Sequence, residues 1–431
     1  MSLLAVRIAC GDETVDVAEQ LRHLQQQNRQ LQEQLNKQQQ LIESLMQKVS
    51  EVETAGQKRE DELRSLKAEM SGSPVPVSEP SKPFSFGKII LSGEGGVAFL
   101  ESGSEGQYPD AAFRVDEAKL FLDAQVFDDV YFYAELNIAE HESNNENTRV
   151  GELYVDFENV SRFWNQPRLL NVRVGRFDTP FGEEYLTRDA IDNPLISHSL
   201  SDIWAEDEGI EIYGSLGKFD YVFAVQNGGI PSLNDYDADK ALVGRVGFTP
   251  AKWLRLSASA MRTGELNANQ DALSALWFGN GFIRALGPAA TEFHADLIEG
   301  DVAFRMPRGH LKAWGGYLRS DDNDPSADDK RNVYYYAIEG MYSLTPKFYG
   351  VARFSQILAA DGYPIVGNGD FGEFFFGALT TDLWRLSLGS GYRWSPNLLL
   401  KVEYSFEQGE EVGGEARDHE DQFGVELAFQ F

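Results

Sequence analysis

Two groups of charged residues have the types and the order in the chain to set up an electric field across a water-filled passage. Four acidic residues fall in or at the edge of one long polar segment: Asp178, Glu183, Glu184 and Asp189. Six arginines fall at positions that strand parity places on an inner wall: Arg173, Arg245, Arg255, Arg353, Arg385 and Arg393. Carboxylates that face guanidinium groups in a narrow constriction favour polar or dipolar solutes and hinder apolar ones. We therefore expect these residues to line a pore constriction. The alternative is that the charges pair with one another and only keep the wall hydrated.

Enzymatic or metal chemistry has little support in the sequence. The histidines at 141, 198, 294, 310 and 419 lie mostly in polar segments, and no G-x-S-x-G, H-E-x-x-H or P-loop pattern occurs. The run Asp321-Asp322-Asn323-Asp324 offers oxygen ligands to hard cations, but it lacks EF-hand spacing. We predict no enzymatic activity, no cofactor and no resident metal, and we interpret the acidic run as a solvated loop.

The elements that must position the charged residues follow a two-residue period from Phe84 to Phe431, which indicates β-strands. In the last one, Phe423, Val425, Leu427, Phe429 and Phe431 share one face, while Gly424, Glu426, Ala428 and Gln430 share the other. The segment 398–407 alternates in the same way. In a transmembrane β-barrel the apolar face contacts lipid and the polar face lines a wet lumen.

Turn signals divide this region into strands joined by short turns and long polar loops in alternation, a rhythm typical of outer-membrane barrels. Short turns are predicted at 128–129, 217–218, 249–252, 306–308, 345–346 and 395–397. Long segments include 141–149, 178–206, 228–240, 263–292, 320–330, 359–379 and 409–419. The fold class predicted is all-β, a 16-stranded antiparallel transmembrane β-barrel over 84–431. The segment 178–206 is expected to fold inward as its constriction loop, and the even strand number places both barrel ends in the periplasm.

The N-terminal part has a different pattern. Residues 1–16 are interpreted as a signal remnant, with lipidation of Cys10 or an ordinary frayed end as alternatives. Apolar residues then recur every 3.5 residues over 17–70, which predicts an α-helical coiled coil, and we expect a trimeric stalk. The Pro-rich segment 71–83 ends this helix and forms an extended linker.

Composition excludes several classes of protein. A formal net charge of −30 excludes nucleic acid as a partner, since phosphate neutralisation requires a basic face. A single cysteine excludes a disulfide framework. A helical membrane protein is excluded because no run of about 18 apolar residues occurs.

Three stretches resemble a known family. Residues 174–182 read VGRFDTPFG, residues 207–214 read DEGIEIYG and residues 225–228 read VQNG. Together with the terminal Phe431 they make the chain similar to the phosphate-selective porin O and P family, in the variant with an N-terminal coiled coil. The resemblance implies a homotrimer in the outer membrane of a Gram-negative (diderm) bacterium, in contact with outer-membrane lipid, that passes small hydrophilic solutes by passive diffusion. It also implies that Phe431, with Phe429, is the signal read by the barrel-assembly machinery.

The chain departs from this family in its charge. Phosphate selectivity in the family depends on basic residues near the constriction, whereas segment 178–206 carries seven acidic residues and one basic residue, Arg188. Over 84–431 there are 55 acidic and 28 basic residues. We therefore expect a weakly cation-leaning or unselective channel. Two alternatives stay open, a selective oxyanion (phosphate) channel and an envelope tether whose periplasmic stalk reaches the cell wall or periplasmic proteins.

Overall fold

A computed structural model describes residues 84–86, 88–141, 148–229, 235–270, 273–326 and 329–431. The predicted N-terminal segment, coiled coil and linker (1–16, 17–70 and 71–83) lie outside the described residues.

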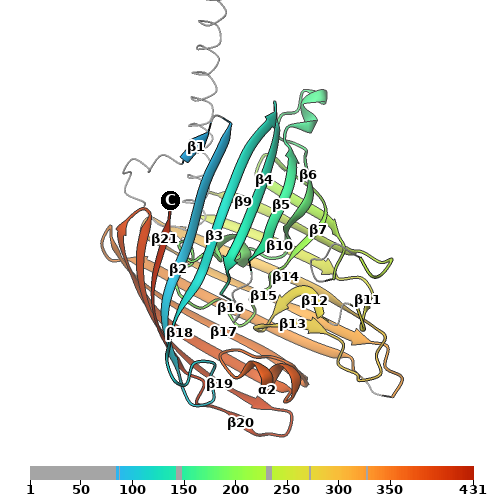
Figure 1. Ribbon diagram of the computed structural model, residues 1–431, viewed down its shortest axis with the longest axis vertical. Helices are drawn as coiled ribbons and strands as arrows, with labels where there is room; N and C mark the ends of the chain where they lie inside the picture. Colours follow the sequence, from blue (N-terminus) through green and yellow to red (C-terminus); the bar gives the residue numbers. More distant parts are fainter. Residues whose placement is uncertain (1–83, 87, 142–147, 230–234, 271–272, 327–328) are drawn as a thin grey trace, which may run out of the picture. The chain divides into compact units, whose positions relative to one another are not determined.

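Sixteen antiparallel strands form one closed barrel, as the sequence predicts (Figure 1). They are β2 (Ile89–Ser102), β3 (Ala112–Phe127), β4 (Val130–Ala139), β5 (Arg149–Phe157), β6 (Asn171–Asp178), β7 (Glu206–Leu216), β8 (Phe219–Gln226), β9 (Ala241–Ala251), β10 (Leu254–Arg262), β14 (Glu292–Met306), β15 (Gly309–Asp322), β16 (Arg331–Ser343), β17 (Phe348–Tyr363), β18 (Thr380–Ser395), β19 (Leu398–Glu411) and β21 (Gln422–Gln430). The barrel closes where β2 pairs with β21, from Glu94 opposite Gln430 to Ser102 opposite Gln422. The short strands β1 (Phe84–Phe86), β11 (Leu266–Asn267) and β20 (Ala416–Arg417) extend this sheet.

The two faces of each strand differ in polarity in the sense opposite to that of a soluble protein. On β19 the interior side chains are polar and buried, whereas the outward ones are apolar and 39–43% exposed. The buried set is Lys401, Glu403, Ser405 and Glu407, and the exposed set is Leu400, Val402, Tyr404 and Phe406. An apolar outer surface is stable in contact with lipid rather than water.

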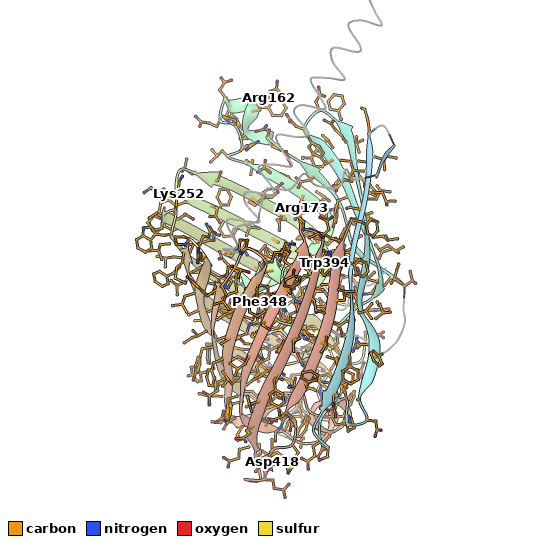
Figure 2. All side chains as sticks on the ribbon, turned by 90° about the vertical axis from the view of Figure 1, so that its left-hand side faces the viewer. Arg162, Arg173, Lys252, Phe348, Trp394 and Asp418 are labelled. Carbon is orange, nitrogen blue, oxygen red and sulfur yellow. The ribbon has the colours of Figure 1, made fainter. Side chains whose placement is uncertain are left out.

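The two ends of the barrel differ in the length of their connections. Strands meet in short turns at 128–129, 217–218, 252–253, 307–308 and 396–397, at or beside predicted turns. At the same end β5 joins β6 through a longer connection containing the 3₁₀ helix η1 (Val160–Trp164). Figure 2 shows Arg162 of this connection and Asp418 of the β19–β21 connection at opposite ends of the barrel.

Part of the interior is packed with apolar side chains, which the expectation of a wet lumen did not anticipate. Phe181, Leu200 and Ile203 from the β6–β7 connection lie in one buried cluster with side chains from β14 to β18. The hairpin of β12 (Leu273–Phe278) and β13 (Gly281–Arg284) adds Leu276, Phe278 and Ile283. The short helix α2 (Phe371–Phe376) packs against this hairpin through Phe375. Connections between strands therefore fill one side of the barrel.

In the described part of the chain, every helix is too short or too polar to cross a membrane.

Candidate pore constriction

The connection between β6 and β7, residues 179–205, contacts the barrel wall at widely separated strands, and we call it the inward loop. Its start bends at Pro180 and at Gly182, whose φ is 66°. A side chain at Gly182 would also meet the carboxylate of Glu299 on β14. A short 3₁₀ helix, η2 (Glu184–Thr187), follows. The loop leaves strand β6 after Asp178, so this predicted loop residue is the last residue of the strand.

Two of the predicted wall arginines hold the first part of the inward loop. Arg245 on β9 donates from Nη1 to the carbonyl oxygen of Gly182 at 2.5 Å. Arg255 on β10 donates from Nε to Oε1 of Glu183 at 2.6 Å, and its Nη1 lies 2.7 Å from Oδ2 of Asp220. The structure thus brings one predicted acid–arginine pair, Glu183 and Arg255, into direct contact.

Two further predicted arginines hold the last part of the loop from the opposite wall. Arg353 on β17 donates from Nη1 to the carbonyl oxygen of Ser197 at 2.8 Å and from Nη2 to Oδ1 of Asn193 at 3.0 Å. Arg385 on β18 donates from Nη1 to the carbonyl oxygen of His198 at 3.2 Å. Each is also paired with a buried glutamate on the neighbouring strand, Glu339 and Glu407 respectively.

Arg173 and Arg393 bond elsewhere. Arg173 on β6 lies 3.3 Å from both Asp156 and Glu211, and its guanidinium carbon is 4.2 Å from the centre of the Tyr154 ring. Arg393 donates to the carbonyl oxygen of Pro396, in the turn between β18 and β19, at 3.4 Å.

The remaining predicted acids have different partners. Asp178 accepts a hydrogen bond from Nε1 of Trp204 at 3.2 Å. Glu184 links two parts of the loop, since its carboxylate accepts hydrogen bonds from the backbone amide and the hydroxyl of Ser199 at 2.9 and 2.6 Å. Oδ1 of Asp189 lies 2.9 Å from Nζ of Lys119 on β3.

Several wall residues that hold the loop were missed by sequence reasoning. Lys401 donates from Nζ to the carbonyl oxygens of Ala190 and Leu195, both at 2.8 Å, and pairs with Glu426 at 2.5 Å. Glu403 accepts from the backbone amides of Ile196 and Ser197 at 2.6 and 2.9 Å. Glu117 accepts from the amide of Ala190 at 2.7 Å. The available signal was a charged residue at a lumen-facing strand position, which Lys401 and Glu403 both are.

Acidic residues predominate where the loop faces β2 to β7. Interior-facing carboxylates occur on every one of these strands, at Glu94, Glu117, Glu135, Glu152, Asp178 and Glu206. Carboxylate oxygens of Glu94, Glu117 and Asp189 lie within 4.8 Å of one another. Cations interleave with them: the ammonium of Lys119 is 2.7 Å from Glu117, and Arg149 lies 2.6 Å from Glu206. Because Lys119 already contacts Glu117 and Asp189, it takes the place that a metal ion would need in this acidic cluster.

Two titratable groups of the inward loop stay neutral near neutral pH. Burial raises the pKa of Tyr185 to about 12, against the opposing effect of Arg245, whose guanidinium carbon is 5.3 Å from the ring centre. Burial also lowers the pKa of His198 well below its usual value, and the nearby charge of Arg188 acts in the same direction.

Two other predicted features have clear positions. Asp322 accepts from the amides of Leu286 and Gly287 at 2.8 and 2.6 Å, and Asp324 accepts from that of Ala289 at 3.0 Å, so these carboxylates hold a neighbouring connection. The backbone amide of Phe431 donates to the carbonyl oxygen of Gly93 at 2.8 Å. Phe429 pairs with Gly95 of β2 and Leu398 of β19, at the seam where the barrel closes.

Comparison with known proteins finds a matching family model and solved structures of similar fold. Residues 96–275 match the family model described as phosphate-selective porin O and P, which confirms the predicted resemblance to this family; the predicted coiled-coil extension lies outside the matched residues. Among solved structures, the outer membrane channel DcaP of Acinetobacter baumannii is similar with 13% identity and a TM-score of 0.54, covering 80% of this chain and 97% of that one. In vitro folded OmpT, an outer membrane protein of Vibrio cholerae, is similar with 12% identity and a TM-score of 0.56, covering 81% and 100%. A trimer form of OmpT is similar with 11% identity and a TM-score of 0.52, covering 80% and 99%. No curated protein matches the sequence. The barrel therefore has the fold of outer-membrane porins.

Proposed function

Because residues 96–275 match a porin family and the barrel has a porin fold, we propose that this protein is a water-filled channel of the bacterial outer membrane. It passes small hydrophilic solutes and ions by passive diffusion. The observation that carries the proposal is a closed barrel of sixteen strands with an apolar outside and a charged inside, crossed by a loop bound to opposite walls. Sixteen strands enclose a lumen wide enough for an aqueous path beside such a loop.

The channel is weakly selective for cations, and the pairing of its arginines with carboxylates supports this. Arg255, Arg353 and Arg385 each pair with a wall carboxylate, Asp220, Glu339 and Glu407, while they hold the inward loop. Their charge is therefore largely compensated. Toward β2 to β7, the carboxylates of Glu94, Glu117 and Asp189 lie within 4.8 Å of one another, and Lys119 is the cation in contact with the last two. A path lined by excess negative charge concentrates cations. A phosphate-selective channel would need the opposite balance.

The constriction in this proposal is lined by the predicted residues that face the loop and by the acidic cluster. Arg245 and Arg255 lie on one side, and Asp189 lies on the other with Glu117 and Lys119. The field between them orients dipolar solutes as they pass.

We further propose a homotrimer whose short turns face the periplasm. A trimer form of OmpT has the same fold, which supports this oligomeric state. The coiled coil proposed for residues 17–70 would join the three chains in the periplasm as a stalk.

Liposome swelling tests the proposed function. Vesicles that contain the purified full-length protein should swell in isotonic arabinose, and more slowly in larger sugars, because a narrow aqueous path discriminates by size. Vesicles that swell no faster than protein-free ones would refute the channel and leave the tether as the surviving function. Three equal conductance steps per insertion event would support the trimer, and single steps would contradict it.

A further inference from the structure

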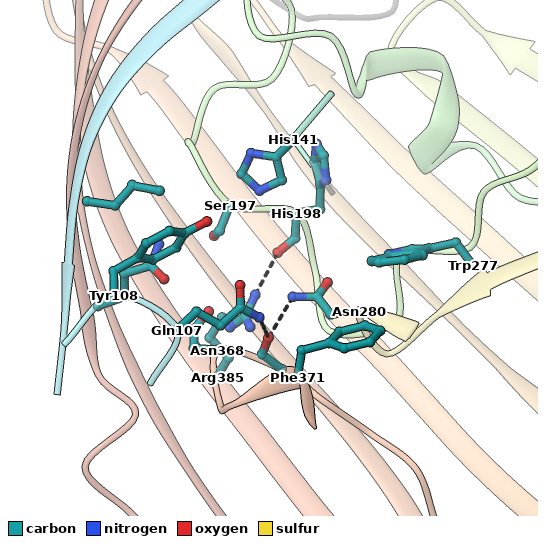
Figure 3. Close-up of a pocket in the computed structure, with 13 residues that line it drawn as sticks. Gln107, Tyr108, His141, Ser197, His198, Trp277, Asn280, Asn368, Phe371 and Arg385 are labelled. Atoms are coloured by element: carbon teal, nitrogen blue, oxygen red, sulfur yellow. Dashed lines mark hydrogen bonds between the residues drawn. The ribbon is translucent and has the colours of Figure 1, made fainter. Parts of the chain in front are cut away.

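Connections between strands fill the barrel beside β14 to β18. There Arg385 donates to the carbonyl oxygen of His198 at 3.2 Å (Figure 3). In the same region, Nδ2 of Asn280 donates to the carbonyl oxygen of Gly367 at 2.7 Å. The cavity left among these residues has a volume of about 50 Å³, which holds only a few water-sized groups at roughly 10–15 Å³ each. The wall opposite, formed by β3 to β7, is the one that a passing solute meets.

Three aromatic rings lie next to one another on the lumen face of this wall, and we call them the aromatic strip: Phe121 on β3, Tyr133 on β4 and Tyr154 on β5. Phe121 shares its strand face with Lys119, which contacts the inward loop, and Tyr133 is the register partner of Tyr154. The ring centres of Phe121 and Tyr133 are 6.2 Å apart, and those of Tyr133 and Tyr154 are 5.1 Å apart. All three residues are partly exposed, so a solute in the lumen can reach them.

One end of the strip already holds a cation that belongs to the protein. The guanidinium carbon of Arg173 on β6 lies 4.2 Å from the ring centre of Tyr154 and 5.4 Å from that of Tyr213 on β7. A cation over the face of an aromatic ring is attracted by the electrons of the ring. The hydroxyl of Tyr213 donates to Asp156 at 2.7 Å, and the guanidinium lies 3.3 Å from the same carboxylate. This wall therefore holds a guanidinium between rings and a carboxylate.

Beside the other two rings lies a carboxylate without a cation. Asp123 follows Phe121 on the same face of β3, is exposed, and lies opposite Tyr133 in the strand register. In the described part of the chain, no basic side chain forms an ion pair with Asp123. Its negative charge, next to partly exposed ring surface, attracts cations. The strip thus offers at Asp123 the same two groups, a ring and a carboxylate, that hold Arg173 at the other end.

We propose that the aromatic strip and Asp123 bind organic cations, in which an ammonium or guanidinium group is joined to a short carbon chain, on their way through the channel. The charged group lies between Asp123 and the ring of Tyr133, and the carbon chain packs along the rings. Apolar surface with a few placed charged groups is typical of small-molecule sites. A neutral solute would leave the charge of Asp123 uncompensated beside the rings. The inference rests on the proposed channel function and names a substrate class for it.

Block of the potassium current by butylguanidinium tests this site. In planar bilayers with the full-length protein in KCl, butylguanidinium should reduce the wild-type current in a saturable way. Butylurea has nearly the same shape and no charge, so it should not block at the same concentrations.

Two variants locate the block. Tyr133→Leu removes a ring of the strip and should raise the half-blocking concentration about threefold, the effect of one cation–π contact at a partly exposed site. Asp123→Asn removes the charge of an exposed side chain and should raise this concentration about two- to fivefold, as for an exposed ion pair. Because Asp123 is exposed, this second variant carries the test if Tyr133→Leu does not fold. Tyr342→Leu is the matched control, since Tyr342 on β16 is 48% exposed on the outer face of the barrel, and it should be blocked like the wild type.

The possible outcomes separate this site from the channel itself. Block that neither Tyr133→Leu nor Asp123→Asn weakens would overturn the site while the channel stands. Equal block by butylurea would overturn the choice of cations as the substrate class. A protein that never conducts would overturn the channel and this inference together.

Discussion

Replacing Lys401 by methionine should release the inward loop from the wall. Its side chain is 1% exposed, and its ammonium group donates to two loop carbonyls, those of Ala190 and Leu195. Each bond from a charged donor contributes about 1.5–3 kcal/mol. Removing one member of a buried ion pair, here the partner of Glu426, costs about 3–5 kcal/mol. Lumen water relieves part of this cost, so we expect the loop to lose about 3 kcal/mol of local stability.

Hydrogen exchange of the loop measures this loss directly. Local opening that becomes easier by about 3 kcal/mol raises exchange by roughly 100-fold for amides exposed only in the open form. The amides of Ala190 and Ile196, bound to Glu117 and Glu403, are the ones to follow. Single-channel current should become larger and noisier, because the loop no longer keeps one position.

Two controls separate this effect from general destabilisation. Lys347→Met removes a lysine whose ammonium donates to the carbonyl oxygen of Trp394 at 3.3 Å and, among the described residues, bonds to no part of the inward loop, so loop exchange should stay unchanged. The double variant Lys401→Met with Glu426→Gln removes both charges and should recover part of the lost protection. If Lys401→Met changes exchange of the loop by less than threefold, the anchoring role of Lys401 is wrong.

Three further predictions address other parts of the site. Arg255→Ser removes a cation and leaves Glu183 and Asp220 without its charge, so the reversal potential in a KCl gradient should shift further toward cation selectivity; an unchanged potential would remove Arg255 from the constriction. Gly182→Ala places a side chain at a residue whose φ is 66° and against the carboxylate of Glu299. This substitution should destabilise the loop by about 1–3 kcal/mol and raise its hydrogen exchange. Gly350→Ala, which has open space around its Cβ, should leave loop exchange unchanged. Burial raises the pKa of Glu420, in the β19–β21 connection, to about 7. The folded state therefore favours the protonated carboxyl. The stability linked to this group is fully present below the ordinary glutamate pKa and is lost as pH rises through about 7. Exchange protection of residues 412–421 should therefore fall between about pH 5 and pH 8, and Glu420→Gln should remove most of that pH dependence; a full pH dependence in the variant would assign it to another group.

The barrel could be predicted because each strand alternates polar and apolar side chains, and this two-residue period can be recognised from neighbouring residues alone. Alternating side chains, as in Leu398–Glu407, fix which face meets lipid, and prolines such as Pro307 and Pro396 mark turns. From these signals the strand number of sixteen follows and is confirmed.

The interior of the barrel could be predicted only in part. Parity placed Arg245 and Arg353 on the inner wall, but it could not show that their partners would be the loop carbonyls of Gly182 and Ser197. Every residue has a backbone carbonyl oxygen, so the residue types do not indicate which carbonyl a side chain will bind. Likewise, Leu276 and Phe278 lie in a segment that appears only as a long loop in the sequence, yet they pack inside the barrel. That packing depends on contacts between distant segments, which local periodicity does not encode.

The reversal potential of the full-length protein in a KCl gradient tests the central claim most directly. We expect an open channel with weak cation selectivity, because buried carboxylates outnumber buried cations along β2 to β7. Neutralising Glu117 on β3 and the loop residue Asp189 that faces it, with Glu117→Gln and Asp189→Asn, should move the potential toward zero. Anion selectivity, with a current that millimolar phosphate blocks, would contradict the cation-leaning channel and establish a selective oxyanion channel in its place.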